Sequence, residues 1–306
     1  MHPAFSVISF TTLLGAAQGL LVSLAALQLF GISIPALPIL LGIGTALLIV
    51  SLGASFLHLG HPERAWRAAA MWRTSWLSRE VIVLPVFISL ASAWTVLEST
   101  GQETRWILMP LVLVSLVLWL CTAMIYACLR FIQEWAHPFT LINYLALGVA
   151  SGLVLLISLL ALIADDSPLT AQLHPWAIGA TLIALIFRHM SSVRNRNIKP
   201  KSSLQTATGI RQPQLTQRSM GMSAGAFNTR EFFHGKTALF LRYVKSIMWG
   251  LCFAMPLVLL LLSFATNNSI FSVLAFPIQY IGLLAERWLF FAQARHPQNL
   301  YYQTVS

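Results

Sequence analysis

The sequence predicts an all-α, polytopic membrane protein, a bundle of eight transmembrane helices. Hydrophobic residues make up 57% of its 306 residues and charged residues only 9%, whereas a soluble domain carries about 25% charged residues. The mean hydropathy is +0.75. Mostly apolar stretches of about 17 residues or more recur along the chain, and each is long enough to cross the roughly 30 Å hydrocarbon core as a helix.

The apolar stretches place the eight spans in order along a single membrane domain, residues 1–306. The opening "MHPAFSVISF" has no basic region before its apolar residues, so the first stretch is expected to be a retained span and not a signal peptide. The third span is short, and Pro175 interrupts the sixth. The spans are expected at about 4–30, 36–58, 80–97, 106–130, 138–164, 169–188, 244–265 and 269–290.

The basic residues predict the orientation. With eight spans, both termini and the loops after spans 2, 4 and 6 share one side, and that side holds 18 of the 19 Lys and Arg residues, all except Arg105. The positive-inside rule then places both termini in the cytoplasm. Because the net charge of +10 is confined to loops beside membrane lipids, a nucleic-acid partner is rejected.

The connection at about 189–243 is the longest loop and is rich in basic and polar residues. Loops of this length are usually functional or disordered. A solvated tether and a docking surface for a soluble partner both remain open. The end of the loop, "GAFNTREFFHG", has three aromatic residues and a Glu–Arg pair, and it favours the docking surface.

Two ionisable residues mark a candidate site between spans 2 and 3. His58 ends the second span, and Glu80 begins the third, just before "VIVLP". Ionisable side chains at membrane depth are costly and indicate function. Both lie at the same end of sequential helices, so they can face each other across a hairpin. A structural salt bridge or a helix cap is the alternative, and the nearby Arg67 and Arg73 are interpreted as topology signals.

Polar residues in the first and last spans are further candidates. Gln18 lies between Gly15 and Gly19, a spacing that lets another helix approach closely; its amide can tie helices together or bind a head group. Glu286 and Arg287 lie near the end of span 8. Adjacent residues point about 100° apart on a helix, so one of the two is expected to face the site, and Glu286 is favoured.

The histidines and cysteines indicate no metal site. Cys121, Cys128 and Cys252 fall within spans without CxxC spacing, so they are interpreted as buried apolar residues, and iron–sulfur clusters usually need four thiolates. A residue before proline is biased away from the helical region. Haem is therefore disfavoured, because five of the eight histidines precede proline and are expected to mark helix ends: His2, His61, His137, His174 and His296.

A site with His, Glu and Arg at the membrane boundary suits a quinone, either ubiquinone or menaquinone. Its ring oxygens take hydrogen bonds, its isoprenoid tail needs an apolar wall, and its redox cycle moves two electrons and two protons. Histidine titrates near physiological pH, and burial raises the pKa of a carboxyl toward that range. The electrons would come from a partner.

The segment "HLGHPERAWRAAAMWRTSWLSREV" resembles the signature of the DMSO reductase anchor (DmsC) family. The resemblance is specific mainly at Gln18, His58 to Arg64, Ser78 to Glu80 (with Arg79 between them) and Glu286. It implies a haem-free, quinone-binding anchor with the quinone at His58 and Glu80, and with Gln18, Arg64, Arg79 and Glu286 as further candidates. An iron–sulfur subunit and a molybdopterin catalytic subunit would be the partners, and the latter would carry the molybdenum chemistry.

Within this family, three segments resemble the anchors of cytoplasmic sulfite-oxidising molybdoenzymes (SoeC-type): the opening "MHPAFSV", "ATGIR" and "FNTREFFH". The resemblance implies electron flow from sulfite to quinone. A quinol-oxidising anchor of a DMSO or S-oxide reductase, and a purely structural anchor, are the alternatives.

Overall fold

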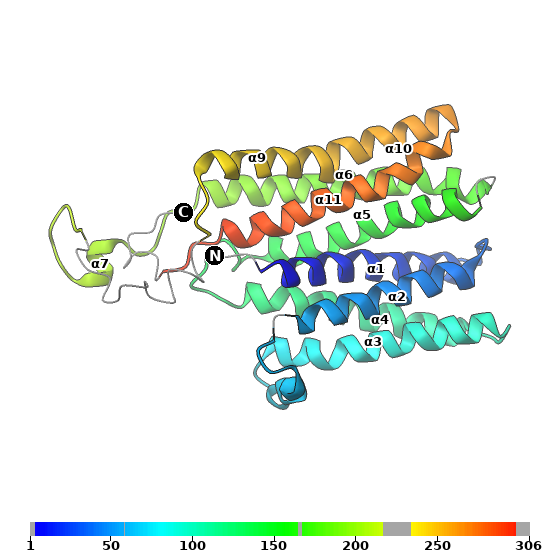
Figure 1. Ribbon diagram of the computed structural model, residues 1–306, viewed down its shortest axis with the longest axis horizontal. Coiled ribbons are helices and arrows are strands. Elements are labelled where there is room, and N and C mark those ends of the chain that lie inside the picture. The colour runs from blue at the N-terminus through cyan, green and yellow to red at the C-terminus, as the bar shows by residue number, and fades with distance from the viewer. Residues whose placement is uncertain (1–3, 58, 165–166, 217–233, 298–306) are drawn as a thin grey trace.

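The structure is a computed structural model that describes residues 4–57, 59–164, 167–216 and 234–297 (Figure 1). Its described residues form helices and connecting turns. In chain order these are α1 (Phe5–Leu29), α2 (Leu37–Phe56), the 3-10 helix η1 (Pro62–Met71), α3 (Trp76–Ser99), α4 (Arg105–Ala127), α5 (Pro138–Ile163), α6 (Pro168–Arg196), α7 (Leu204–Thr208), α9 (Ala238–Trp249), the π-helix η2 (Gly250–Ala254), α10 (Met255–Thr266) and α11 (Ser269–Ala292).

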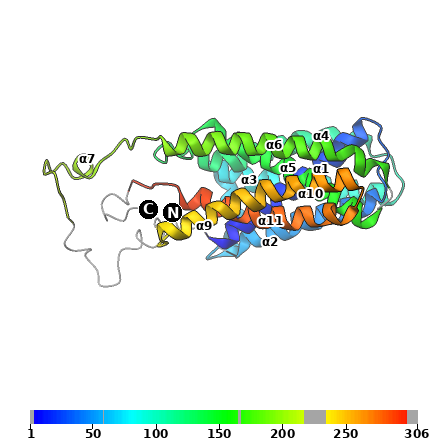
Figure 2. The same ribbon diagram turned by 90° about the horizontal axis from the view of Figure 1, so that it is seen from above.

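The predicted fold class is confirmed. Across the described ranges, eight helices are long and apolar enough to cross a membrane, with α9, η2 and α10 forming one continuous helix, Ala238–Thr266. Figures 1 and 2 show these helices running side by side along one long axis. Many large apolar side chains, such as Ile49, Val86 and Leu113, are exposed on the helices, as expected where lipid surrounds a bundle. The chain is a multi-pass membrane protein.

Three helix boundaries differ from the prediction. Helix α3 begins four residues earlier, at Trp76, where Ser75 Oγ caps the helix by accepting a hydrogen bond from the Ser78 amide. Helix α6 continues to Arg196, and α9 begins at Ala238. Apolar composition marks the hydrocarbon thickness, whereas α6 continues beyond it with Arg194 and Arg196, and α9 begins before it with a turn that contains Arg242. The long connection is therefore shorter than predicted, 197–237, and most of "GAFNTREFFHG" lies outside the described residues.

Helices α1 and α5 form the centre of the bundle. Helix α1 contacts α2, α4, α5 and α11, and α5 contacts α1, α4, α6 and α11. The two helices cross where Gly19 faces Gly148 and Gly152, so closely that a Cβ on Gly19 would overlap the Gly148 backbone. A Cβ on Gly15 would approach no atom closer than 3.9 Å. The close helix approach expected of this glycine pair thus occurs at Gly19.

Two expectations about single residues are wrong. His174 was expected at a helix end, but it is buried inside α6. Its ring nitrogens lie 2.7 Å from the Thr170 carbonyl oxygen and 3.0 Å from Ser272 Oγ. The following Pro175 removes one helical hydrogen bond near the start of a long helix, and these side-chain bonds help to hold the segment. Cys128 was expected to be buried, but it caps the end of α4 and is exposed.

The two ends of the bundle differ. The start of α1, the end of α2, η1, the end of α6, α7 and the end of α11 all lie at one end (Figure 1). We call this the α7 end and the other the far end. The side chains of η1 are largely exposed and include Arg64 and Arg67. The start of α3, which carries Glu80, and the charged end of α11 belong to the α7 end.

Candidate functional site

A polar stripe on α4 organises the candidate site. Ser115, Trp119, Thr122 and Tyr126 are spaced by four, three and four residues, so their side chains share one face of the helix. Ser115 is fully buried, and Trp119 and Thr122 are nearly so. This face receives polar side chains from two other helices, Gln18 from α1 and Glu80 from α3. The stripe therefore connects two of the sequence-predicted residues.

Glu80 lies one turn inside α3 and is only 5% exposed. The Thr122 hydroxyl donates a hydrogen bond to Glu80 Oε1. Burial of an ionised carboxylate is costly unless it is paired and hydrogen-bonded, and no salt bridge to Glu80 occurs within the described residues. A carboxyl in such surroundings is suited to exchange a proton with a ligand beside it.

Gln18 lies deeper in the bundle. Its Nε2 donates to Ser115 O over 2.6 Å and to Ser115 Oγ over 2.9 Å. Because Ser115 and Thr122 are seven residues apart, Gln18 and Glu80 contact α4 about 10 Å apart along its axis. Gln18 therefore ties α1 to α4, and its side chain also lines a small inner cavity together with Thr122 and Arg287.

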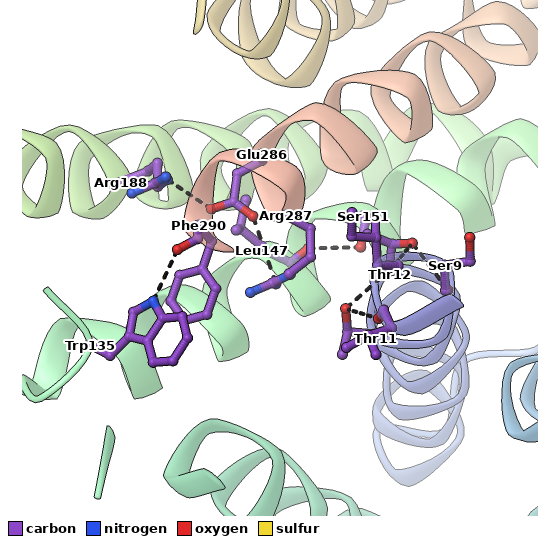
Figure 3. Close-up of polar contacts among 12 residues, drawn as sticks. Ser9, Thr11, Thr12, Trp135, Leu147, Ser151, Arg188, Glu286, Arg287 and Phe290 are labelled. Atoms are coloured by element: carbon purple, nitrogen blue, oxygen red, sulfur yellow. Dashed lines mark hydrogen bonds and ion pairs between the residues drawn. The ribbon is translucent and has the colours of Figure 1, made fainter. Parts of the chain in front are cut away.

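Glu286, Arg287 and Arg188 form a buried charge cluster (Figure 3). Arg188 Nε lies 2.8 Å from Glu286 Oε1, and Arg287 Nη2 lies 3.8 Å from Glu286 Oε2. The three side chains are between 2% and 6% exposed. Removing one partner from a buried ion pair is strongly destabilising, by about 3–5 kcal/mol. This cluster thus fixes α6 against α11 at the α7 end.

The two adjacent α11 residues point to different neighbours. Glu286 pairs with Arg188 across the α6 interface, whereas the Arg287 guanidinium lies 3.9 Å from the centre of the Tyr144 ring. It is Arg287 that lines the inner cavity with Gln18. Both residues line a second cavity next to it. Both side chains therefore line a polar cavity, whereas only one of the two was expected from the sequence to face the site.

Aromatic rings surround this cluster at the α7 end. Tyr126 packs edge-on against Trp135, with ring centroids 5.3 Å apart, and stacks on Tyr144 at 6.0 Å. The Trp135 Nε1 donates to the Phe290 carbonyl oxygen over 2.9 Å, joining the α4–α5 connection to α11. These rings pack beside the buried charges and hold the helix ends together.

The remaining predicted residues lie in or beside the α2–α3 connection. His58 lies outside the described residues. Arg79 is half-buried, and its guanidinium donates to the carbonyl oxygens of Trp72 and Arg73 over 2.9 Å each, so it closes the turn between η1 and α3. Arg64 lies on η1 with an exposed side chain, 3.7 Å from Glu63. The structure therefore places Arg64 at the surface and Glu80 inside the bundle.

Sequence reasoning missed Thr122 and Arg188. Thr122 is an ordinary residue of an apolar span, and only the spacing from Ser115 could have indicated its face. Arg188, in "LIALIFRHM", was counted as one of many topology charges. A signal was available, because Arg188 directly follows a continuous apolar run and so lies at membrane depth, where a charge indicates function or pairing.

Comparison with known proteins is consistent with this architecture. The family model of the DMSO reductase anchor subunit (DmsC) matches residues 1–291. The C subunit of the sulfite dehydrogenase of Allochromatium vinosum is similar to the chain, with 46% identity over 327 aligned positions that cover 100% of both proteins. The match spans all eight membrane helices, the α2–α3 connection and the buried charge cluster, so the chain belongs to the DMSO reductase anchor subunit (DmsC) family.

Proposed function

We propose that the chain is the membrane anchor of a sulfite-oxidising molybdoenzyme and transfers electrons from an iron–sulfur subunit to a membrane quinone. The full-length similarity to the C subunit of a sulfite dehydrogenase supports the substrate class. The observation that carries the quinone assignment is Glu80, a buried carboxyl that is hydrogen-bonded to Thr122 at the α7 end. The molybdenum chemistry belongs to the partner catalytic subunit.

The donors at this site fit a quinone as substrate. Quinone reduction consumes two electrons and two protons and yields a quinol. Glu80 is placed to donate a proton to a ring oxygen, and His58 is the second proton donor expected from the sequence. The inner cavity has a volume of about 20 Å³, which admits about one water. We therefore place the quinone ring outside it, on the side of Glu80 toward the α2–α3 connection.

The basic residues of the α7 end support an orientation of the chain in the membrane and form a docking surface for the iron–sulfur subunit. Arg64 and Arg67 on η1 are exposed, and the same end carries the basic α6–α9 connection. The positive-inside rule favours the cytoplasm for this end, in the inner membrane of a bacterium. An iron–sulfur subunit that docks there is close to Glu80, and the molybdopterin subunit binds to that subunit. A cytoplasmic catalytic partner agrees with sulfite oxidation.

The test uses the purified complex and two electron acceptors. Glu80→Gln and His58→Ala are each expected to lower quinone-coupled sulfite oxidation by about 10²–10⁴-fold, because each removes a positioned acid–base group. Activity with an artificial dye that takes electrons from the soluble subunits is expected to stay unchanged. Glu98→Gln is the matched control, because Glu98 lies at the far end of α3, where it accepts hydrogen bonds from Gln28 and Thr104.

The outcomes separate this function from the alternatives. Equal losses with quinone and dye would make Glu80 and His58 structural, and would favour a purely structural anchor. The family also supports a second candidate, a quinol-oxidising anchor of a DMSO or S-oxide reductase. That candidate is favoured if the complex reduces S-oxides with quinol and fails to oxidise sulfite. Assays with ubiquinone and menaquinone in turn identify the quinone.

We further propose that this subunit holds neither haem nor an iron–sulfur cluster. Its cysteines lack the grouping that clusters usually require, and both ring nitrogens of the buried His174 lie within hydrogen-bond distance of oxygen atoms. The separated subunit is expected to show no b-type band in a reduced-minus-oxidised spectrum and no bound iron by elemental analysis. A b-type band from this subunit would contradict the proposal.

A further inference from the structure

Three cavities follow one another at the α7 end of the bundle. The inner cavity, about 20 Å³, is lined by Gln18, Thr122, Tyr144 and Arg287 among others. The middle cavity, also about 20 Å³, is lined by Glu134, Asn143, Tyr144, Arg188, Glu286 and Arg287 among others. The outer cavity, about 170 Å³, is lined by residues that include Glu134, Asn195, Gln293 and Arg295.

Shared wall residues show that these cavities are neighbours in a series. Tyr144 and Arg287 line both the inner and the middle cavity. Glu134, Asn195 and Gln293 line both the middle and the outer cavity. We call the series the polar corridor. It begins at Thr122, whose hydroxyl is bonded to Glu80, and ends beside Arg295, whose side chain is 58% exposed.

Three residues that line the middle cavity have buried polar atoms that need a hydrogen-bond partner. Asn143 Oδ1, Glu286 Oε2 and Arg287 Nε are buried and make no hydrogen bond to the described part of the chain. Buried polar groups are nearly always hydrogen-bonded, to protein or to water. A cavity of about 20 Å³ with several polar partners meets the requirements of an ordered water. The geometry therefore indicates water inside the corridor, beside Glu286.

The charges of the middle cavity balance. Two guanidinium groups, Arg188 and Arg287, face two carboxylates, Glu286 and Glu134. Glu134 is itself 8% exposed, and its Oε1 lies 3.9 Å from the exposed Arg295. A carboxylate between two arginines accepts hydrogen bonds from a water beside it, and the fixed charges hold that water in place while protons pass along it. Glu286 and Glu134 thus offer two positions in series that can hold ordered water by hydrogen bonds.

We propose that the polar corridor supplies protons from the aqueous phase at the α7 end to Glu80. The inference rests on the proposed quinone reduction. Each proton that Glu80 gives to the quinone is replaced by one that enters at the outer cavity, passes Glu134 and the water beside Glu286, and reaches Glu80 through the inner cavity and the Thr122 hydroxyl. One such transfer accompanies each two-electron turnover, because His58 supplies the second proton of the quinol. Arg287 and Arg188 position Glu286 and stay charged throughout.

The test measures proton delivery separately from folding and from electron input. Glu286→Gln keeps the shape of the side chain and removes the negative charge that holds the water and attracts a proton to it. In the purified complex, we expect quinone-coupled turnover to fall by about tenfold, less than the roughly 10²–10⁴-fold loss on removal of a positioned acid. Dye-coupled turnover stays unchanged. We also expect a larger solvent deuterium isotope effect and recovery of activity with millimolar formate, a small weak acid that carries protons.

Two further variants keep the test decisive. Asn143→Leu fills the middle cavity with apolar atoms and keeps every charge, so it serves if Glu286→Gln fails to assemble; the same loss and isotope effect are expected. Glu98→Gln, the same chemical change at the far end, is expected to alter none of the three readouts. An unchanged quinone-coupled rate in both corridor variants, or a loss without any isotope effect or formate rescue, overturns the corridor.

The outcome for Glu80 distinguishes the two proposals. If Glu80→Gln lowers quinone-coupled turnover and the corridor variants do not, the proposed function stands and protons reach Glu80 by another route. If Glu80→Gln leaves quinone-coupled turnover intact, the assignment of the quinone site fails, whatever the corridor variants show.

Discussion

At the scale of single residues, the side chain that positions Glu80 is Thr122. Its hydroxyl donates to Glu80 Oε1 and also lines the inner cavity. A buried carboxylate without an ion-pair partner depends strongly on each hydrogen bond that it accepts. Thr122 therefore fixes the rotamer of Glu80 and connects it to the polar corridor.

Thr122→Val tests this role, because valine has nearly the same shape and no hydroxyl. We expect quinone-coupled turnover to fall, by less than in Glu80→Gln, since the carboxyl remains but is no longer held. Thr122→Ser keeps the donor and is expected to retain most activity. Equal activity of the valine and serine variants would show that the bond has no part in the reaction.

At the scale of helices, the crossing of α1 and α5 sets the positions of the site residues. Gly19 packs directly on the Gly148 backbone, and small residues allow such approaches in membranes, where packing replaces the hydrophobic drive between helices. Helix α1 then places Gln18 on α4, and α5 places Tyr144 against Arg287. A change in this crossing would therefore reach both sides of the inner cavity.

Two glycines on one helix provide a matched pair of variants. Gly19→Ala forces a Cβ into the Gly148 backbone, and we expect it to destabilise the subunit by about 1–3 kcal/mol, as overpacking does. Gly15→Ala meets no atom closer than 3.9 Å and is expected to leave stability unchanged or slightly higher. Thermal unfolding of the purified complex in detergent measures the difference. Equal melting temperatures would contradict the close crossing.

At the scale of the whole molecule, the charges separate along the bundle axis. The α7 end holds the exposed arginines of η1 and the buried cluster around Glu286, and the far end holds Glu98 and a network in which Ser272 lies within hydrogen-bond distance of His174 and Ser263. The first end presents charge to water and to partner subunits, whereas the second closes the bundle with hydroxyl groups. This asymmetry is what the positive-inside rule uses to orient a chain.

Cysteine labelling of intact cells and inverted vesicles tests the orientation. The background is Cys128→Ser, because Cys128 is exposed while Cys121 and Cys252 are buried. A cysteine at Gln205, on α7, is expected to react with an impermeant maleimide only from the cytoplasmic side. A cysteine at Gln102, between α3 and α4, is the opposite control. Labelling of Gln205→Cys from the periplasm would reverse the orientation and remove the main argument for a cytoplasmic sulfite-oxidising partner.

The sequence by itself determined the fold class, the eight spans and the separation of basic residues, because these depend on composition and chain order. It also indicated Glu80 and Glu286, since a charge in an apolar span is conspicuous. Helix ends were less predictable: α6 and α9 continue past the apolar residues that marked them. The role of His58 remains a prediction from the sequence, because this residue lies outside the described part of the chain.

Only the tertiary structure decided which residues meet. Thr122 and Glu80 are 42 positions apart, and Arg188 reaches Glu286 from another helix. The apolar helices of a membrane bundle are hydrophobic on nearly every side, since lipid tails are as apolar as a protein core, so the pattern of residues does not reveal which face turns inward. Packing at Gly19, Gly148 and Gly152 settles those rotations, and with them the polar corridor.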